Sequence, residues 1–125
     1  MVFINNMIVQ QVHHRNVVEQ LIAADVAEVT NTTWTNHIRH KLVNGEVKIN
    51  IGQMEPDYGY EYIGTPLMLV VTPLTCEAYL THCTSLTQGK MGSAFGPAGT
   101  GKTETIKDLA RHHLGQLCIV FNTSN

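Results

Sequence analysis

One stretch of the sequence has the residue types and the spacing of a phosphate-binding loop. Residues 96–103 fit the pattern GxxxxGK[ST] of a Walker A loop. The pattern needs glycines because the backbone N–H groups must surround a polyphosphate, which requires close approach and positive φ angles. The residues predicted to hold the phosphates are Gly96, Pro97, Ala98, Gly99, Thr100, Gly101, Lys102 and Thr103.

Two side chains of this loop have separate predicted roles. Lys102 is placed to reach the β and γ phosphates of a bound polyphosphate as a point charge, and the Thr103 hydroxyl is a predicted ligand of Mg²⁺. The helix expected to begin here directs its N-terminal dipole at the same anion. The alternative is a glycine-rich turn that binds nothing, and the elements around the loop make it the weaker interpretation.

Those elements have the order strand, loop, helix, strand. A short strand over residues 92–95, a helix over 102–114 and an apolar strand over 117–121 predict a βαβ unit with the loop in its expected place. The helix has an apolar stripe of Ile106, Leu109, Ala110 and Leu114. Its outward residues are predicted to be Glu104, Lys107, Asp108 and Arg111.

Upstream of the loop, hydrophobic periodicity and turn residues predict six further elements. Asn44-Gly45 is expected to end the second of them, and Thr75 to cap the last. In chain order they are a helix over 15–29, a short helix from Asn31 to Leu42, a strand over 47–51, an aromatic strand or hairpin arm over 58–64, a buried strand over 67–71, and a helix over 75–88.

Histidines and aromatic residues offer other candidate sites. A zinc site needs a third and a fourth ligand at readable spacing, and the histidine pairs show none, so we interpret them as solvated residues of helix faces. The pairs are His13-His14, His37 with His40, and His112-His113. Trp34 and the tyrosines at 58, 60 and 62 could stack on bases, but without interleaved basic residues they more readily form core or module contacts.

The cysteines and the composition exclude several classes of protein. Cys76, Cys83 and Cys118 lack CxxC spacing and read as reduced thiols of an intracellular protein, with Cys76 and Cys83 on an apolar helix face rather than in a nucleophile pair. A chain of 125 residues with 43% hydrophobic and 14% charged residues is globular rather than disordered. A net charge of -2 gives no basic surface of the kind that binds nucleic acid. The longest apolar run, 67–71, is too short for a membrane span.

Several sequence blocks resemble the first AAA+ module of dynein heavy chains. They are Tyr-Gly-Tyr-Glu-Tyr-Ile-Gly at 58–64, Leu-Val-Val-Thr-Pro-Leu-Thr at 69–75, Gly-Pro-Ala-Gly-Thr-Gly-Lys-Thr-Glu-Thr at 96–105, Lys-Asp-Leu-Ala at 107–110 and Val-Phe-Asn at 120–122. The order and spacing of these blocks are specific to that family. Residues 1–57 are similar in layout to the end of the dynein linker, so 1–57 is expected to be a linker-end segment and 58–125 the N-terminal part of the module.

The resemblance implies an α/β fold: a partial P-loop NTPase (AAA+) module with an incomplete parallel sheet, preceded by a small segment of helices and a β-hairpin. It implies ATP and Mg²⁺ as cofactors. It also places the adenine-side contacts on five residues, Val70, Val71, Thr72, Pro73 and Leu74. Cys76-Glu77 stands where the family usually has Asp-Arg, which affects local packing rather than phosphate binding.

The resemblance further implies that this is the ATP-binding portion of a microtubule motor ATPase, cytoplasmic and cytoskeletal, in a ciliary or flagellar axoneme. Its expected direct partners are the rest of the heavy chain and its AAA+ ring. Through the parent protein it is also expected to associate with intermediate and light chains and with microtubules. Neither nucleic acid nor a membrane is an expected partner. No Walker B strand ending in Asp-Glu follows Asn122, so no catalytic residue is predicted and the chain alone is expected not to hydrolyse ATP. The alternative is a divergent stand-alone nucleotide-binding or interaction protein without catalysis.

Overall fold

The computed structural model describes residues 1–123 and begins with a long helix, α1 (Val2–Ala23). The sequence predicts a helix over residues 15–29, so its presence is confirmed but both ends are wrong. The helix ends early because Asp25 adopts a left-handed conformation, with φ of 49°. The N–H of Val26 then bonds the carbonyl of Leu21 at 3.0 Å, which is the bond that closes a Schellman C-cap.

A short helix and a hairpin follow α1. Helix α2 (Thr32–Thr35) is capped by the side chain of Asn31, and strands β1 (Arg39–Val43) and β2 (Glu46–Asn50) pair in antiparallel register. The predicted strand at 47–51 is therefore confirmed within one residue, whereas the helix predicted as far as Leu42 is wrong. Asn44-Gly45 has φ angles of 53° and 85°, which form a two-residue type I′ turn, and such a turn requires a strand on each side.

Two helices build the second half of the fold, and both predictions of them are confirmed with adjusted ends. Helix α3 (Pro73–Thr87) begins at Pro73 because Thr72, rather than Thr75, is its N-cap and shares a capping box with Thr75. Helix α4 (Lys102–Asp108) continues into the π-helical turn η1 (Leu109–His113). The N–H of Leu114 reaches back five residues to the carbonyl of Leu109 at 3.0 Å.

The predicted parallel sheet and βαβ unit do not form among residues 1–123, where the only sheet is the β1–β2 hairpin. The segments 58–64, 67–71, 92–95 and 117–121 form no strand and belong to no ladder, and Tyr60 and Gly64 turn the first of them with φ angles of 54° and 75°. In three of them, backbone N–H groups bond other parts of the chain instead. The N–H of Leu69 donates to the carboxylate of Asp108, that of Gly59 to the carbonyl of Leu114, and that of Leu117 to the carboxylate of Glu61.

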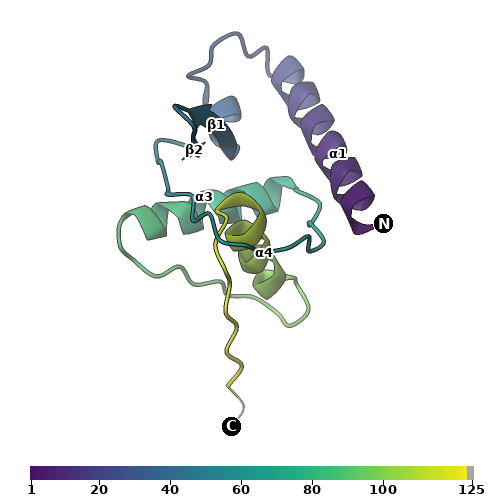
Figure 1. Ribbon diagram of the computed structural model, residues 1–125. Helices are drawn as coiled ribbons and strands as arrows, with labels where there is room; N and C mark the ends of the chain where they lie inside the picture. The colour runs from purple at the N-terminus through teal and green to yellow at the C-terminus, as the bar shows by residue number, and fades with distance from the viewer. Residues whose placement is uncertain (124–125) are drawn as a thin grey trace.

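The core joins both halves of the sequence. It consists of buried side chains from β2 and the residue after it, from α3, and from the helix after the loop: Ile49, Ile51, Tyr79, Cys83, Leu109 and Leu114. Figure 1 shows α3 and α4 crossing below the hairpin, with α1 along one side and the C-terminal segment running away from the body. Along that segment Leu117, Ile119 and Phe121 are exposed.

Candidate functional site

The predicted phosphate loop joins the extended residues after α3 to the first turn of α4. Residues 91–101 are all exposed, and three glycines of the loop have positive φ angles: Gly96 at 153°, Gly99 at 77° and Gly101 at 79°. A Cβ atom at Gly99 or Gly101 would meet no atom within 4 Å. These two glycines are therefore required by backbone conformation rather than by crowding.

The backbone of this loop offers a run of free hydrogen-bond donors. Within residues 1–123, residues 98 and 99 form a turn, and apart from that turn none of the N–H groups of residues 98–104 donates a hydrogen bond to the protein. The next amide, that of Thr105, bonds the carbonyl of Gly101 at 2.9 Å and so begins the helical ladder. Exposed, unpaired amides around left-handed glycines form the kind of concavity that binds anions, so the backbone fits a polyphosphate.

Lys102 directs its ammonium group into the loop. Its Nζ donates to the carbonyl of Gly96 at 3.0 Å, to the hydroxyl of Thr100 at 3.1 Å, and to the carbonyl of Pro97. The Thr100 hydroxyl in turn donates to the Pro97 carbonyl at 3.0 Å. The ammonium has three donors, so these acceptors use all of them and a phosphate would have to replace at least one.

The remaining residues of the predicted loop lie at its surface. Ala98 is exposed at the tip, and Thr103 is exposed in the first turn of α4. Within the part of the chain that the structure describes, the Thr103 hydroxyl forms no hydrogen bond with protein. A free hydroxyl next to Lys102 suits the predicted Mg²⁺ ligand, because Mg²⁺ takes oxygen ligands and keeps several waters.

The predicted adenine-side residues form the entry to α3. Thr72 is the N-cap and Pro73 the first residue of the helix, with Leu74 exposed beside them. Val71 packs against the core, whereas Val70 is exposed. The structure thus fixes the backbone of this segment by a helix cap at one end and the core contact of Val71 within it.

Asp108 has a role that the sequence pattern missed. It was predicted to face outward, but it is 4% exposed and its carboxylate accepts hydrogen bonds from the N–H of Leu69 at 2.9 Å and the hydroxyl of Tyr79 at 2.7 Å. Burial alone would raise the pKa of Asp108, but these hydrogen bonds and nearby His113 lower it overall. One feature of the sequence could have indicated that Asp108 has partners: His112 follows it by four residues, which places both on one helix face.

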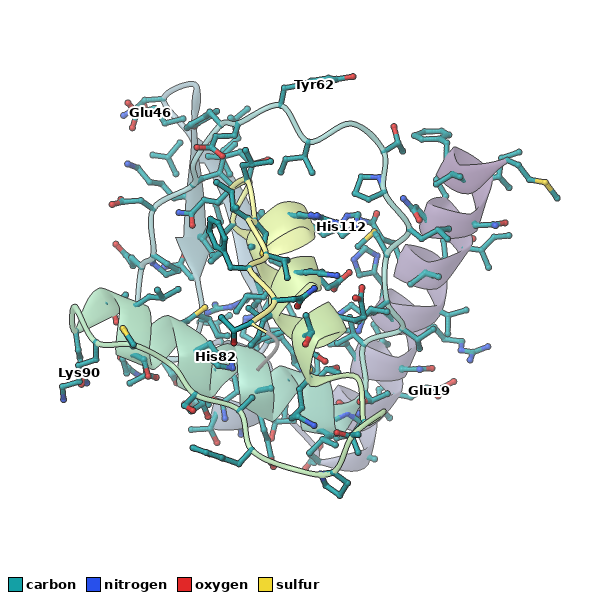
Figure 2. The ribbon with its side chains drawn as sticks, turned by 90° about the horizontal axis from the view of Figure 1, so that it is seen from below. Glu19, Glu46, Tyr62, His82, Lys90 and His112 are labelled. Atoms are coloured by element: carbon teal, nitrogen blue, oxygen red, sulfur yellow. The ribbon has the colours of Figure 1, made fainter. Side chains whose placement is uncertain are left out.

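The interpretation of the histidines as solvated is wrong for four of them, which are partly or largely buried: His13, His37, His112 and His113. They line a cavity of about 710 Å³ between α1, the hairpin and the end of the loop helix, away from the phosphate loop. Figure 2 shows His112 between that helix and α1. Among residues 1–123, no three His, Cys, Asp or Glu side chains come together in an arrangement that could hold a metal ion.

Cys76 and Cys83 lie on α3 as predicted, whereas of the tyrosines at 58, 60 and 62 only Tyr58 packs against the core. Cys83 is buried in the core, and Cys76 lies half-buried with its Sγ 3.7 Å from Nδ1 of His37. Tyr58 packs against the core, whereas Tyr62 is 94% exposed and points away from the body (Figure 2). None of the described helices is both long enough and apolar enough to cross a membrane.

Comparison with known proteins gives a consistent result over nearly the whole chain. The family model described as the hydrolytic ATP binding site of the dynein motor region matches residues 58–125. The sequence is 40% identical to cytoplasmic dynein 2 heavy chain 1 of Caenorhabditis elegans over 119 residues, 95% of this chain and 3% of that protein. It is 43% identical to human dynein axonemal heavy chain 3 over 114 residues, 91% of this chain and 3% of that protein.

A third relative, human dynein axonemal heavy chain 9, is 46% identical over 116 residues, which is 90% of this chain and 2% of that protein. The chain therefore spans about 3% of the length of the curated relatives that it matches. An alignment that covers 95% of the chain also includes most of residues 1–57, whose resemblance by motif was weaker.

Proposed function

Because the chain belongs to the dynein heavy-chain family, we propose that it is the ATP-binding portion of a microtubule motor and that residues 96–103 hold the phosphates of Mg-ATP. The observation that carries the proposal is the run of free amides at 98–104, arranged around left-handed glycines and followed at once by a helix. Such a loop binds polyphosphate mainly through its backbone.

In this proposal two side chains of the loop have different roles: one binds phosphate through its charge, and the other binds Mg²⁺ through its oxygen. Lys102 exchanges its carbonyl partners in the loop for phosphate oxygens, which accept stronger, charge-assisted hydrogen bonds. Thr103 contributes its hydroxyl to Mg²⁺, which neutralises part of the phosphate charge when bound. Residues 70–74 supply the adenine-side contacts through the exposed surface of Val70 and Leu74.

For these 125 residues the proposal is nucleotide binding rather than turnover. Turnover needs a carboxylate that helps hold Mg²⁺ and another that orients water, normally at the end of a Walker B strand. Neither carboxylate is among the residues proposed here to hold Mg-ATP, 70–74 and 96–103. ATP hydrolysis and movement along microtubules therefore belong, in this proposal, to a larger heavy chain that contains those groups.

We propose the rest of a dynein heavy chain and its AAA+ ring as the direct partner. The support is the row of exposed apolar side chains on the extended C-terminal segment: Leu117, Ile119, Val120 and Phe121. Large apolar side chains in a row mark a surface that another element covers. The relatives include axonemal and cytoplasmic dynein heavy chains, which supports a cytoskeletal and ciliary location.

A titration of the full chain with ATP tests this function. We expect saturable binding that strengthens when Mg²⁺ is present, with no phosphate released over the time of the measurement. Thr103→Val should remove the Mg²⁺ effect and leave some binding of ATP without metal, because the backbone amides of the loop remain. Absence of saturable binding under either condition by a chain that is folded would contradict the proposal.

A further inference from the structure

The strongest unexplained feature outside the loop is the buried carboxylate of Asp108. Burying an ionised carboxylate is unfavourable unless hydrogen bonds or charges compensate it. Here each oxygen has its own partner: Oδ1 accepts from the N–H of Leu69 at 2.9 Å, and Oδ2 accepts from the hydroxyl of Tyr79 at 2.7 Å. Both partners therefore lie at fixed positions around one planar group.

Two imidazoles complete the surroundings of this carboxylate. Nε2 of His112 lies 3.8 Å from Oδ1, and Nε2 of His113 lies 3.6 Å from Oδ2, beyond hydrogen-bond length. Both nitrogen atoms are buried without a hydrogen-bond partner among residues 1–123. Asp108 thus has two hydrogen-bond donors and, slightly farther away, two imidazoles around its carboxylate.

The two hydrogen bonds connect segments that are far apart in the sequence. Leu69 is 39 residues and Tyr79 is 29 residues from Asp108. Asp108 follows Lys102 by six residues, about 9 Å along a helix at 1.5 Å per residue. Leu69 directly precedes the adenine-side segment, and Tyr79 lies on the helix that this segment begins.

From this placement we propose that Asp108 is a positioning residue, which sets the spacing between the phosphate loop and the adenine-side segment so that one nucleotide contacts both. This inference rests on the proposed function. A polyphosphate without a base uses the loop alone, whereas ATP uses the loop and residues 70–74. Asp108 therefore contributes to the preference for a nucleotide over a bare polyphosphate.

The test compares ATP with inorganic tripolyphosphate on the full chain, with Mg²⁺ present. Asp108→Asn keeps one oxygen acceptor but removes the negative charge, so the hydroxyl of Tyr79 loses its charged acceptor and can only accept from the new amide NH₂. We expect ATP affinity to fall about tenfold, the effect of one lost hydrogen bond to a charged group, while tripolyphosphate affinity changes less than about twofold. Tyr79→Phe removes the same bond from the other side and should give the same pattern.

A matched control separates positioning from general stability. Cys83→Ala removes a buried side chain one turn after Tyr79 on the same helix but leaves both hydrogen bonds in place. It should not change the ratio of the two affinities. If Cys83→Ala changed the ratio as much as Asp108→Asn, or if Asp108→Asn and Tyr79→Phe weakened both ligands equally, the positioning role would be wrong. If the unaltered chain bound neither ligand, the proposed function itself would fail.

Discussion

The hydroxyl of Tyr79 on α3 donates a hydrogen bond of 2.7 Å to the carboxylate of Asp108 on α4, and both side chains are buried. Burial, together with this hydrogen bond, raises the pKa of Tyr79, so the phenol stays protonated and remains a donor. The two helices are thereby joined inside the fold, whereas the loop that begins α4 is exposed. Changes in the loop should therefore alter binding with little effect on stability, whereas changes at Tyr79 or Asp108 should lower stability as well as the affinity for ATP.

Gly115 is the glycine whose replacement should destabilise the fold most clearly. It has φ of 61°, and a Cβ atom there would lie 2.4 Å from the ring of Tyr58. The carbonyls of this turn accept hydrogen bonds from the N–H groups of Gly59 and Glu61. Because these bonds hold the backbone that follows Tyr58 against the turn, the Tyr58 ring cannot move away without breaking them. Gly115→Ala should lower the free energy of unfolding by about 2 kcal/mol or more, measured by urea titration.

Gly89 provides the matched control for this change. Its φ is 66°, nearly the same as that of Gly115, but a Cβ atom there meets nothing within 4 Å. Gly89→Ala should therefore lower the free energy of unfolding by only about 1 kcal/mol, the cost of the backbone conformation alone. Equal losses in the two variants would show that the contact with Tyr58 contributes nothing.

The cap of α3 gives a second prediction about stability. The side chain of Thr72 accepts the N–H of Thr75 at 3.3 Å, and the Thr75 hydroxyl accepts the N–H of Thr72 at 2.7 Å. Thr72→Ala should lower the free energy of unfolding by about 1 kcal/mol, and Thr72→Ser should restore most of it. Thr81→Ala, in the middle of the same helix, should change the free energy of unfolding by less than about 0.5 kcal/mol. A loss as large in Thr81→Ala would contradict a specific cap.

The buried histidines predict how stability depends on pH. Burial and the neighbouring His37, His14 and His113 lower the pKa of His13 from 6.5 to about 4. Between these values the unfolded chain binds a proton that the folded chain does not, so the free energy of unfolding should fall as pH falls from 6.5 to 4.

His13→Gln should reduce this pH dependence, measured by urea titration across that range. Part of the dependence should remain, because burial also lowers the pKa of His37 and His112. A slope that is unchanged by His13→Gln would show that the folded chain does not exclude the proton from His13. The experiment therefore tests the packing of α1 against α2 and His37 as well as the pKa.

Local signals in the sequence predicted the helices at 75–88 and 102–114 to within a few residues, but they placed both ends of α1 wrongly and extended the helix after Asn31 into strand β1. The glycines around Lys102 define the loop through backbone angles that depend on a few adjacent residues. The cap of α3 is equally local, but the sequence predicted it at Thr75, whereas it lies at Thr72. The hairpin was also present in the sequence as Asn44-Gly45, but the same pair reads as a helix end when the preceding residues show helical spacing. In the structure Asn44-Gly45 forms the hairpin turn, and the residues before it form a strand.

The remaining errors concern partners that are far away in the sequence. An apolar run such as 67–71 has the composition of a strand, but a strand requires a neighbour, and here the N–H of Leu69 bonds the Asp108 side chain instead. Asp108 has a polar side chain, so periodicity places it on the surface. The positions of Tyr79 on another helix and of Leu69, both far away in the sequence, explain why Asp108 is buried.

The account depends most on the role of Lys102 in binding phosphate. The direct measurement is a titration of a fluorescent ATP analogue into the Lys102→Ala variant, with circular dichroism to show that the fold is intact. Lys107→Ala is the control, because Lys107 lies on the same helix but pairs with Glu104 at 2.6 Å. We predict that Lys102→Ala abolishes saturable binding and that Lys107→Ala binds like the unaltered chain. Undiminished affinity in Lys102→Ala would contradict the assignment of residues 96–103 as the phosphate site.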